Sequence, residues 1–292
     1  MSAPGDEAVV GRVDEVADAR GGAAATPSWP QNRNCGTNSN SVSDSLDVNP
    51  YVGEGGSYAS VRPAYPGEAV AALLDAAQAS SVSLRAADIG AGTGKMSELL
   101  ARAGAVVDAV EPSGAMRAQA SSIPGVTWHA GVAEETTLPH GAFDIVVFAQ
   151  SWHWVDPERA GVEAARILAP GGALAIVWNQ MDVSIPWVHR LTRIMRSGDV
   201  HRPDRPPTPG GGFGPMRLTQ VAWEDVMTPE QILTLGTTRS SYIRSSPAGR
   251  ERMQANLRWY LYEHLGYAPG QDIAIPYTTL VWLGERSNEL SN

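Results

Sequence analysis

The 292-residue chain contains a single cysteine, Cys35, and only three phenylalanines. One cysteine excludes an internal disulfide, and with it the small disulfide-bonded scaffolds of secreted domains. Cations are also scarce, because 22 Lys and Arg stand against 31 Asp and Glu, a formal net charge of -9. Since binding to a phosphate backbone needs a surplus of cations on some face, we expect no nucleic-acid partner.

Long hydrophobic runs are absent as well. No apolar run approaches the roughly 18 residues that a membrane-spanning helix needs, and the N-terminus lacks the basic start and apolar run of a signal peptide. The six histidines are scattered without the spacing of metal ligands. We therefore expect a cytoplasmic protein with no membrane partner and no metal site.

Residues 1–50 differ in composition from the rest of the chain. They are rich in Gly, Ala, Ser, Asn and Asp, and Trp29 is their only aromatic residue. Such a segment has too little apolar surface to offset the entropy lost on ordering, so we predict a flexible extension. The alternative is a flap that orders over a ligand.

From Tyr51 onward, short apolar segments alternate with helical patterns. We expect strands over 84–91, 105–112, 125–134, 142–150 and 173–180, and helices over 94–104, 113–122 and 156–172. This alternation of buried strands with helices predicts an α/β fold with a doubly wound, mostly parallel sheet. The core domain should occupy 51–180.

The C-terminal part is less regular, and we assign 181–270 to a helical cap with acceptor-binding insertions. Expected here are helices over 184–198, 228–238 and 246–266, a strand over 216–223, and a loop rich in Pro and Gly over 202–215. Thr228 should be the N-cap of its helix. Residues 271–292 should supply the last strand, broken near Pro276, and a tail.

The stretch "ADIGAGTG" places Gly90, Gly92 and Gly94 directly after Asp88, between a strand and a helix. Glycine permits positive φ and close backbone approach, and the helix directs its N-terminal amides to the same place. Ligands of open parallel sheets bind at the carboxyl ends of the strands. A nucleotide-like ligand is therefore expected at this loop.

Details of spacing restrict the kind of nucleotide. A P-loop needs a hydroxyl residue after Lys95, where Met96 stands, and the glycines do not follow the dinucleotide pattern. Asp88 would repel a phosphate and attract an ammonium. Glu111, 17 residues after Gly94, is placed to accept ribose hydroxyls. A ligand with an ammonium, a ribose and no phosphate is S-adenosylmethionine.

At this point the chain resembles the class I S-adenosylmethionine-dependent methyltransferases. The motifs are "ADIGAGTG", "AVEPSGAM", "GVAEETTLP", "FDIVVFAQSWHWVDP" and "ILAPGGALAIVWN". The flanking "YASVRPAYP" and "TTRSSYI" are similar to the branch that includes trans-aconitate methyltransferase-like enzymes, and the resemblance spans about 58–283. It implies a Rossmann-like seven-stranded sheet with a helical cap, and S-adenosylhomocysteine as the product.

The resemblance also implies a set of cofactor contacts. These are Asp88, Gly90, Ala91, Gly92 and Gly94 at the methionine end, Glu111 at the ribose, Pro112 and Met116 beside the adenine, Ala133 and Glu134 at its edge, and Gln150 at the methyl donor.

Residues that might meet the acceptor gather in three motifs. His153 is the best-placed candidate base, although it could simply pack its loop; of its neighbours Trp152 and Trp154, one should face the pocket and the other the core. Tyr58, Arg62 and Tyr65 should cover the cofactor, with Arg62 alternatively paired to a carboxylate. Arg239 and Tyr242 lie where they could orient an anionic acceptor.

We expect methyl transfer to an oxygen, of a carboxylate or a hydroxyl, on a small-molecule acceptor. One alternative is C- or N-methylation of an aromatic such as an indole, which the nine tryptophans suggest. The other is a cofactor-binding protein without transfer activity that serves as a regulator or partner. Either a monomer or a homodimer is compatible with the sequence.

Overall fold

The computed structural model describes residues 62–77, 83–120, 123–197 and 201–286, which all belong to one structural unit. The extension expected over 1–50 and the candidate Tyr58 lie outside these residues. No helix within the described ranges has the length and apolar character to cross a membrane.

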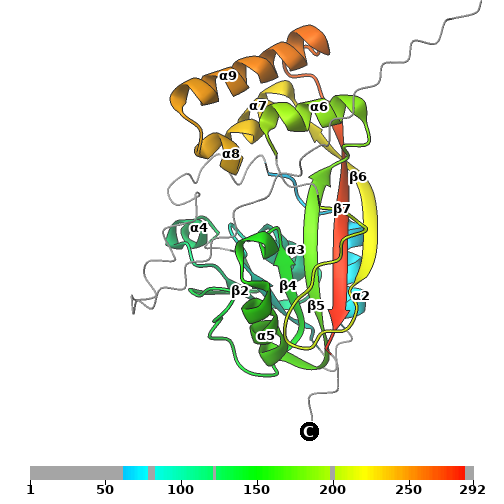
Figure 1. Ribbon diagram of the computed structural model, residues 1–292. Helices are drawn as coiled ribbons and strands as arrows, with labels where there is room; N and C mark the ends of the chain where they lie inside the picture. Colours follow the sequence, from blue (N-terminus) through cyan, green and yellow to red (C-terminus); the bar gives the residue numbers. More distant parts are fainter. Residues whose placement is uncertain (1–61, 78–82, 121–122, 198–200, 287–292) are drawn as a thin grey trace, which may run out of the picture. The chain divides into compact units, whose positions relative to one another are not determined.

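The described chain forms one seven-stranded sheet in the order β3-β2-β1-β4-β5-β7-β6 (Figure 1). The strands are β1 (Arg85–Ile89), β2 (Val106–Val110), β3 (Val126–His129), β4 (Phe143–Ala149), β5 (Leu168–Met181), β6 (Arg217–Met227) and β7 (Ile273–Glu285). Strands β1 to β5 pair in parallel, and β7 is antiparallel to both β5 and β6. The expected seven-stranded, mostly parallel α/β sheet is confirmed.

Helices cover both faces of this sheet. They are α2 (Gly67–Ala76), α3 (Lys95–Arg102), α4 (Gly114–Gln119), α5 (Pro157–Ile167), α6 (Pro186–Met195), α7 (Pro229–Thr237), α8 (Ser240–Ile243) and α9 (Pro247–Arg258), with a 3-10 helix η2 (Trp152–Trp154) and a π-helical turn η3 (Trp259–His264).

Strand β4 shows why both faces need cover. Its side chains alternate: Val146 and Phe148 pack in the cluster that contains α5, whereas Ile145 and Val147 pack in the cluster that contains α2 and α3. Successive side chains of a strand point to opposite faces, so a strand with helices on both sides is apolar throughout. That is why the part of β4 after Asp144, from Ile145 to Ala149, is an unbroken hydrophobic run.

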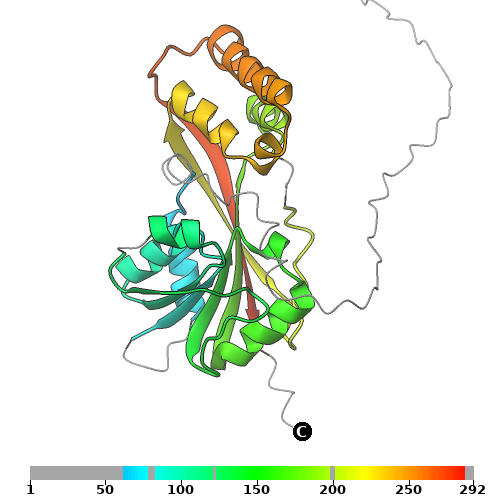
Figure 2. The same cartoon turned by 90° about the vertical axis from the view of Figure 1, so that its left-hand side faces the viewer.

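A third apolar cluster forms the helical cap. Strands β5, β6 and β7 run on toward helices α6, α7 and α9, as the yellow and red strands show in Figures 1 and 2. Their ends supply Met181, Met227 and Ile273 to the cluster, which also holds Leu191 of α6 and Leu257 of α9. The cap therefore shares a continuous core with the extended ends of three strands, instead of resting on a linker.

The structure corrects the expected break at Pro276, because β7 runs unbroken from Ile273 to Glu285. The carbonyl of Pro276 accepts the Asp182 N–H at 2.9 Å, so its missing N–H also faces β5. The pairing of β7 with β5 ends at Met181 and Tyr277, one residue from Pro276. The missing N–H of Pro276 therefore costs few of the hydrogen bonds between these strands. Pairing with β6 continues through Glu224.

Two other expectations change in detail. The helix predicted over 156–172 ends at Ile167, because the segment that contains Pro170 joins β5. The segment 181–270, expected as the cap, also contains β6, which is the edge strand of the sheet. The Thr228 N-cap is confirmed, since its side chain accepts the Gln231 N–H within a capping box.

Candidate active site

The glycine loop follows β1 at the carboxyl edge of the parallel strands. Gly90, Gly92 and Gly94 have φ of 70°, 61° and 85°, a region that other residues rarely adopt. A Cβ on Gly90 would lie 2.6 Å from the Cβ of Ser151, and one on Gly94 would lie 2.7 Å from the Cδ1 of Ile123. Both backbone conformation and space therefore require glycine here.

Asp88 lies beneath this loop and is fully buried. Its Oδ2 accepts the Ser97 hydroxyl at 2.6 Å, whereas its Oδ1 has no hydrogen-bond partner among the described residues. Burial raises the pKa of Asp88 to about 6, against the opposing effect of the Ser97 hydrogen bonds. A buried carboxylate oxygen without a partner is a site for a cationic group or a bridging water.

Glu111 follows β2 and reaches the same loop. Its Oε2 accepts the Gly92 N–H at 2.9 Å, and its Oε1 accepts the Ser113 N–H at 2.8 Å. Burial raises the pKa of Glu111, and these two backbone hydrogen bonds oppose the rise. A carboxylate offers about four acceptor positions, so two remain for the hydroxyls of a ligand.

A cavity opens where the glycine loop meets the cap. Its lining includes the glycine loop from Gly90 to Thr93 and polar side chains of several elements. The latter are Arg62, Tyr65, Lys95, Gln150, Asn179, Gln180, Thr192, Ser197, Arg239 and Tyr277. Among the described residues, no Asp or Glu lines it.

Comparison with known proteins identifies the chain. Residues 87–176 match the methyltransferase domain family. A solved structure from Anaeromyxobacter dehalogenans, provisionally named a type II methyltransferase, is 26% identical with a TM-score of 0.59, covering 77% of this chain and 97% of that one. The uncharacterized methyltransferase Rv3342 of Mycobacterium tuberculosis is 39% identical over 227 residues, 77% of this chain and 90% of the relative. The chain belongs to the class I S-adenosylmethionine-dependent methyltransferases.

A more distant relative agrees with this assignment. The methyltransferase-like protein C25B8.10 of Schizosaccharomyces pombe is 27% identical over 227 residues, covering 74% of this chain and 87% of its own. The cofactor of the methyltransferase is accordingly S-adenosylmethionine, as expected from the sequence. The resemblance to the trans-aconitate methyltransferase-like branch stays a prediction.

The residues at the carboxyl edge fit this cofactor on their own chemistry. The unpartnered Oδ1 of Asp88 suits the ammonium, the remaining acceptor positions of Glu111 suit the ribose hydroxyls, and the glycine backbone permits close approach. When bound, the cofactor supplies a methyl group on a positively charged sulfur. The individual contacts are still predictions.

The residues expected near the adenine lie around α4 and after β3. Met116 is buried, and its Sδ lies 3.7 Å from the position of a Cβ on Gly92, which places it beside the glycine loop; Pro112 directly follows Glu111 in the chain. Ala133 packs in a core cluster. The Oε1 of Glu134 accepts the Asp156 N–H at 2.8 Å and so ties its loop to the start of α5.

Gln150, at the end of β4, has an unusual backbone. Its φ is 58°, which is rare outside glycine, and its Nε2 donates to the Asn179 carbonyl at 2.6 Å. The neighbouring Ser151 donates its hydroxyl to the Ile89 carbonyl at 2.6 Å. These bonds join the ends of β4, β5 and β1, and backbone strain of this kind is typical of functional sites.

The cationic side chains of the cavity are held by the surrounding backbone. Arg62 donates to the Thr238 carbonyl, and Lys95 donates to the Arg62 carbonyl, each at 2.6 Å. Burial lowers the pKa of Lys95, and the charge of Asp225 opposes this. Burial raises the pKa of the Tyr277 hydroxyl to about 12, against the charge of Arg239.

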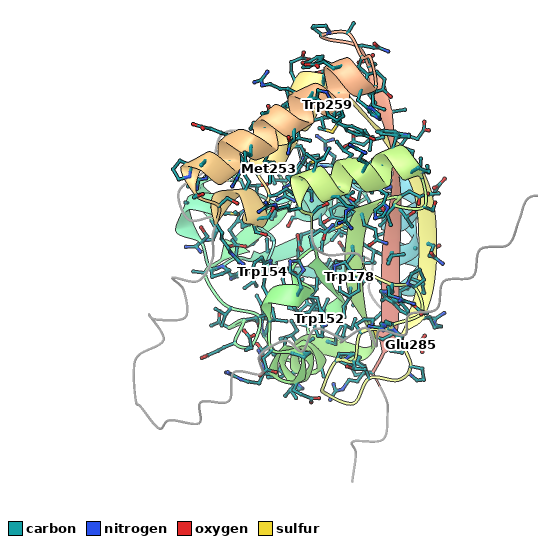
Figure 3. All side chains as sticks on the ribbon, turned by 45° about the horizontal axis from the view of Figure 1, so that its top comes forward. Trp152, Trp154, Trp178, Met253, Trp259 and Glu285 are labelled. Carbon is teal, nitrogen blue, oxygen red and sulfur yellow. The ribbon has the colours of Figure 1, made fainter. Side chains whose placement is uncertain are left out.

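Four candidate acceptor residues lie outside the cavity lining. His153 is exposed, with its ring 5.0 Å from Trp154 and 6.1 Å from His201. Trp152 packs edge-on against Phe148 in the core, while Trp154 is 48% exposed under the guanidinium of Arg244; Figure 3 labels both. Tyr242 packs on the cap core, and Arg250 covers its ring.

The cavity also contains residues that the sequence interpretation missed. Tyr277 lies on β7 and Asn179 on the neighbouring strand β5, so their meeting at this cavity depends on pairing between segments that are far apart in the sequence. From the sequence, Lys95 bears only on the exclusion of a P-loop, because Met96 follows it in place of a hydroxyl residue. Its position directly after Gly94 could have indicated that it lies beside the glycine loop, where it lines the cavity.

Proposed function

We propose that this methyltransferase transfers a methyl group to a carboxylate oxygen of a small anionic acceptor. The observation that carries the proposal is the charge of the cavity beside the glycine loop. Arg62, Lys95 and Arg239 line it, and no described carboxylate does. An anion entering such a cavity is attracted by Arg62 and Arg239, and by Lys95, whose charge the nearby Asp225 partly offsets.

The donor itself accounts for only part of this charge. Its methionine end carries one carboxylate, which the ammonium of Lys95, directly after the glycine loop, is suited to hold. Arg239 comes from the cap and lies close enough to Tyr277 to oppose the burial effect on its hydroxyl. We assign Arg239 and Arg62 to the acceptor, because two guanidiniums can grip a carboxylate through planar paired hydrogen bonds.

Methylation of a carboxylate also requires no general base among the residues of the cavity. The acceptor oxygen attacks the methyl carbon while the carbon–sulfur bond breaks and its electron pair stays on sulfur. No proton leaves the acceptor, so alignment and exclusion of water are the main requirements. This agrees with the position of His153, the expected base, outside the cavity lining.

The two other acceptor classes receive less support. The aromatic side chains that line the cavity are Tyr65 and Tyr277, and no tryptophan of the described chain lines it, which removes the observation that suggested an indole. A hydroxyl acceptor would need a base. The lowered pKa of Lys95 is the one observation that favours it.

Product analysis tests the proposal directly. The full chain is incubated with methyl-labelled donor and a panel of carboxylates, phenols and indoles. We expect label in a methyl ester that alkali releases. Arg239→Gln should raise the acceptor KM at least about tenfold while the Kd for S-adenosylhomocysteine is unchanged. The control is Arg244→Gln, at an exposed arginine of the same cap region. Label confined to phenols or indoles would overturn the carboxylate assignment.

A pH-rate profile separates carboxylate from hydroxyl acceptors. His153→Ala should change turnover by less than about tenfold on a carboxylate, because a positioned base contributes roughly 10² or more only where a proton must leave. The native and His153→Ala profiles should have the same shape through the titration range of histidine, because Asp88, whose pKa burial raises to about 6, titrates there in both. A large loss in the variant, with a native rate that rises with pH, would instead establish His153 as a base.

A further inference from the structure

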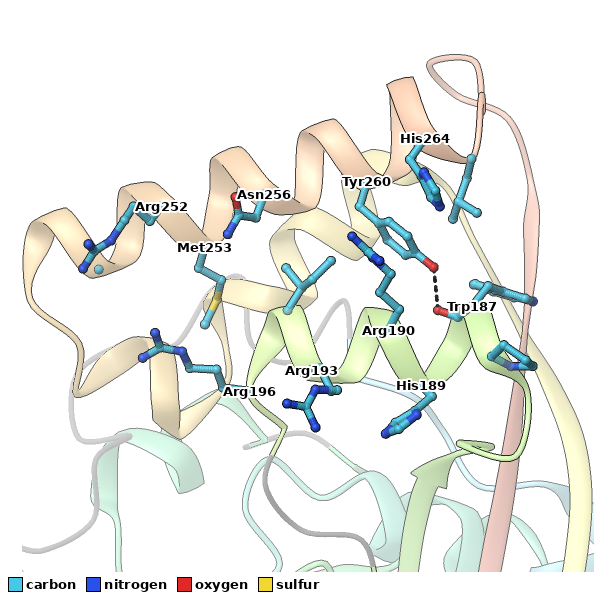
Figure 4. Close-up of a pocket in the computed structure, with 14 residues that line it drawn as sticks. Trp187, His189, Arg190, Arg193, Arg196, Arg252, Met253, Asn256, Tyr260 and His264 are labelled. Carbon is cyan, nitrogen blue, oxygen red and sulfur yellow. Dashed lines mark hydrogen bonds between the residues drawn. The ribbon is translucent and has the colours of Figure 1, made fainter. Parts of the chain in front are cut away.

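The helical cap carries a second cavity, away from the glycine loop. It lies between α6 and α9, with a volume of about 1090 Å³, and Figure 4 shows the side chains around it. No described residue lines both this cavity and the one at the glycine loop. Nothing in the methyl-transfer reaction uses it, so its composition needs a separate explanation.

Positive charge is concentrated along this cavity. Arg190 and Arg193 project from α6, Arg196 follows that helix, and Arg252 lies across from them on α9 (Figure 4). No described Asp or Glu lines the cavity, and no salt bridge neutralises any of these four arginines within the described chain. A chain with a net charge of -9 thus gathers four like charges on one groove.

Local helix electrostatics explains only part of the cluster. The partial negative charge at the C-terminus of α6 favours cations in its last turn, which accounts for Arg193 and Arg196. It does not account for Arg252, which lies in the second turn of α9. Mutual repulsion of these guanidiniums is unfavourable, and an anion between α6 and α9 would offset it.

The spacing of the arginines indicates the shape of the anion. Arg190 and Arg193 lie roughly 4.5 Å apart along the helix axis, at about 1.5 Å per residue, and Arg196 continues the row beyond the end of α6 at Met195, with a left-handed φ of 48°. A single phosphate or carboxylate would meet only one part of this row. The arrangement fits a ligand whose negative charges repeat along its length.

The remaining lining favours a protein over a small molecule or a nucleic acid. Trp187 lines the groove beside the arginines and is partly exposed, and its residue type is enriched at protein interfaces, whereas Met253 and Tyr260 belong to the buried core of the cap beneath. The Tyr260 hydroxyl donates to the Trp187 carbonyl at 2.9 Å, which braces α9 against α6. A long nucleic acid would meet repulsion from the acidic remainder of the chain, whereas a short peptide segment would not.

We propose that the groove between α6 and α9 docks a carboxylate-rich segment of a partner protein. Carboxylates of the segment pair with Arg190, Arg193, Arg196 and Arg252, and an apolar side chain between them packs on Trp187. This surface is separate from the acceptor cavity, so it does not depend on which acceptor the enzyme methylates.

The test measures binding of a fluorescein-labelled peptide in which Glu alternates with Leu and Ala, by fluorescence anisotropy at about 50 mM salt, where screening is weak. The full chain should bind this peptide, and a peptide with every Glu replaced by Gln should not bind. Arg252→Glu should weaken binding at least about tenfold, because a close opposite charge becomes a like charge.

Arg258→Glu is the matched control, since Arg258 is exposed on the same helix and does not line the groove. It changes net charge equally and should weaken binding less than about twofold. Thermal melting checks that each variant is folded, and Arg193→Gln replaces Arg252→Glu if that variant melts early. Equal losses from Arg252→Glu and Arg258→Glu, or tighter binding of a single-stranded oligonucleotide to the same groove, would overturn the proposal.

Discussion

Asp88 shows at the scale of one residue how a binding group can lower stability. Its carboxyl is fully buried, one oxygen has no partner in the described structure, and burial together with the charge of Glu111 raises its pKa to about 6. At neutral pH the folded protein therefore holds a buried charge that a nearby ammonium would offset. We therefore expect this position to serve the cofactor more than the fold.

This gives a prediction for Asp88→Asn with the sign fixed by linkage. Because the pKa of Asp88 in the folded protein exceeds its unfolded value of 3.8, Asp88 is protonated to a greater extent in the folded than in the unfolded chain between pH 3.8 and about 6. Its contribution to the free energy of unfolding then falls as pH rises through that window, by an amount on the order of 3 kcal/mol. Without the cofactor, Asp88→Asn should be more stable than the native chain near pH 8, and the gap should shrink near pH 4. Urea unfolding at both pH values measures this.

Asp108→Asn provides the contrast, because Asp108 lies on the neighbouring strand β2 and pairs with both Arg85 and His129. Removing that charge should destabilise the protein at neutral pH.

Calorimetry with S-adenosylhomocysteine should show binding about tenfold weaker in Asp88→Asn, since a charge-assisted contact is lost. An Asp88→Asn protein less stable than the native one at every pH would contradict the prediction.

At the scale of elements, the segment over 202–215 shows that a glycine outside the active site can allow two backbone segments to pack closely. The sequence predicted a loop there, and the segment forms no helix or strand in the structure. Gly210 nevertheless packs on the start of α5, donating its N–H to the Pro157 carbonyl at 3.0 Å. A Cβ on Gly210 would lie 2.4 Å from the Glu158 carbonyl oxygen, so the two backbones meet where no side chain fits.

We therefore expect Gly210→Ala to destabilise the protein by about 1–3 kcal/mol, because the clash is with backbone that cannot move aside. Gly67→Ala is the control, since nothing lies within 4 Å of its added Cβ and the residue begins α2. That change should be neutral or stabilising by up to about 1 kcal/mol. Thermal unfolding of the two variants tests this prediction. Similar melting temperatures would show that the loop over 202–215 can shift to accommodate the added Cβ.

At the scale of the whole molecule, charge is distributed unevenly. The chain is acidic overall, yet both cavities described above are lined by arginines or lysine and by no described carboxylate. Net charge correctly disfavours long polyanionic ligands, but it does not reveal where cations gather. Long-range repulsion acts on the whole surface, whereas binding depends on the few side chains that line a site.

Deleting residues 1–45 tests how far the catalytic unit is independent. Their composition supplies little apolar surface, so we expect the truncated chain to keep its melting temperature within about 3 °C and to bind S-adenosylhomocysteine with unchanged Kd. Scanning calorimetry and titration calorimetry measure the two quantities. A large fall in melting temperature would refute independence. Lost turnover with intact binding would support the alternative of a flap over the ligand.

The sequence by itself determined the α/β class, the cofactor and the glycine loop that follows β1. These rest on local patterns: the apolar run of β4, the alternate glycines after Asp88, and a capping box that begins at Thr228. Local periodicity and φ preference act within a few residues, so they can be read along the chain. The bounds of most strands and helices follow for the same reason.

Only the tertiary structure decided which side chains share the cavity at the glycine loop. Arg62, Arg239 and Tyr277 meet there because β7 inserts between β5 and β6 and the cap folds over its end, which no local pattern encodes. The same strand pairing keeps β7 continuous through Pro276. It also decided that Trp152 packs in the core and that His153 lies outside the cavity lining, although the two are adjacent in sequence. Long-range packing, which depends on every element at once, makes that choice.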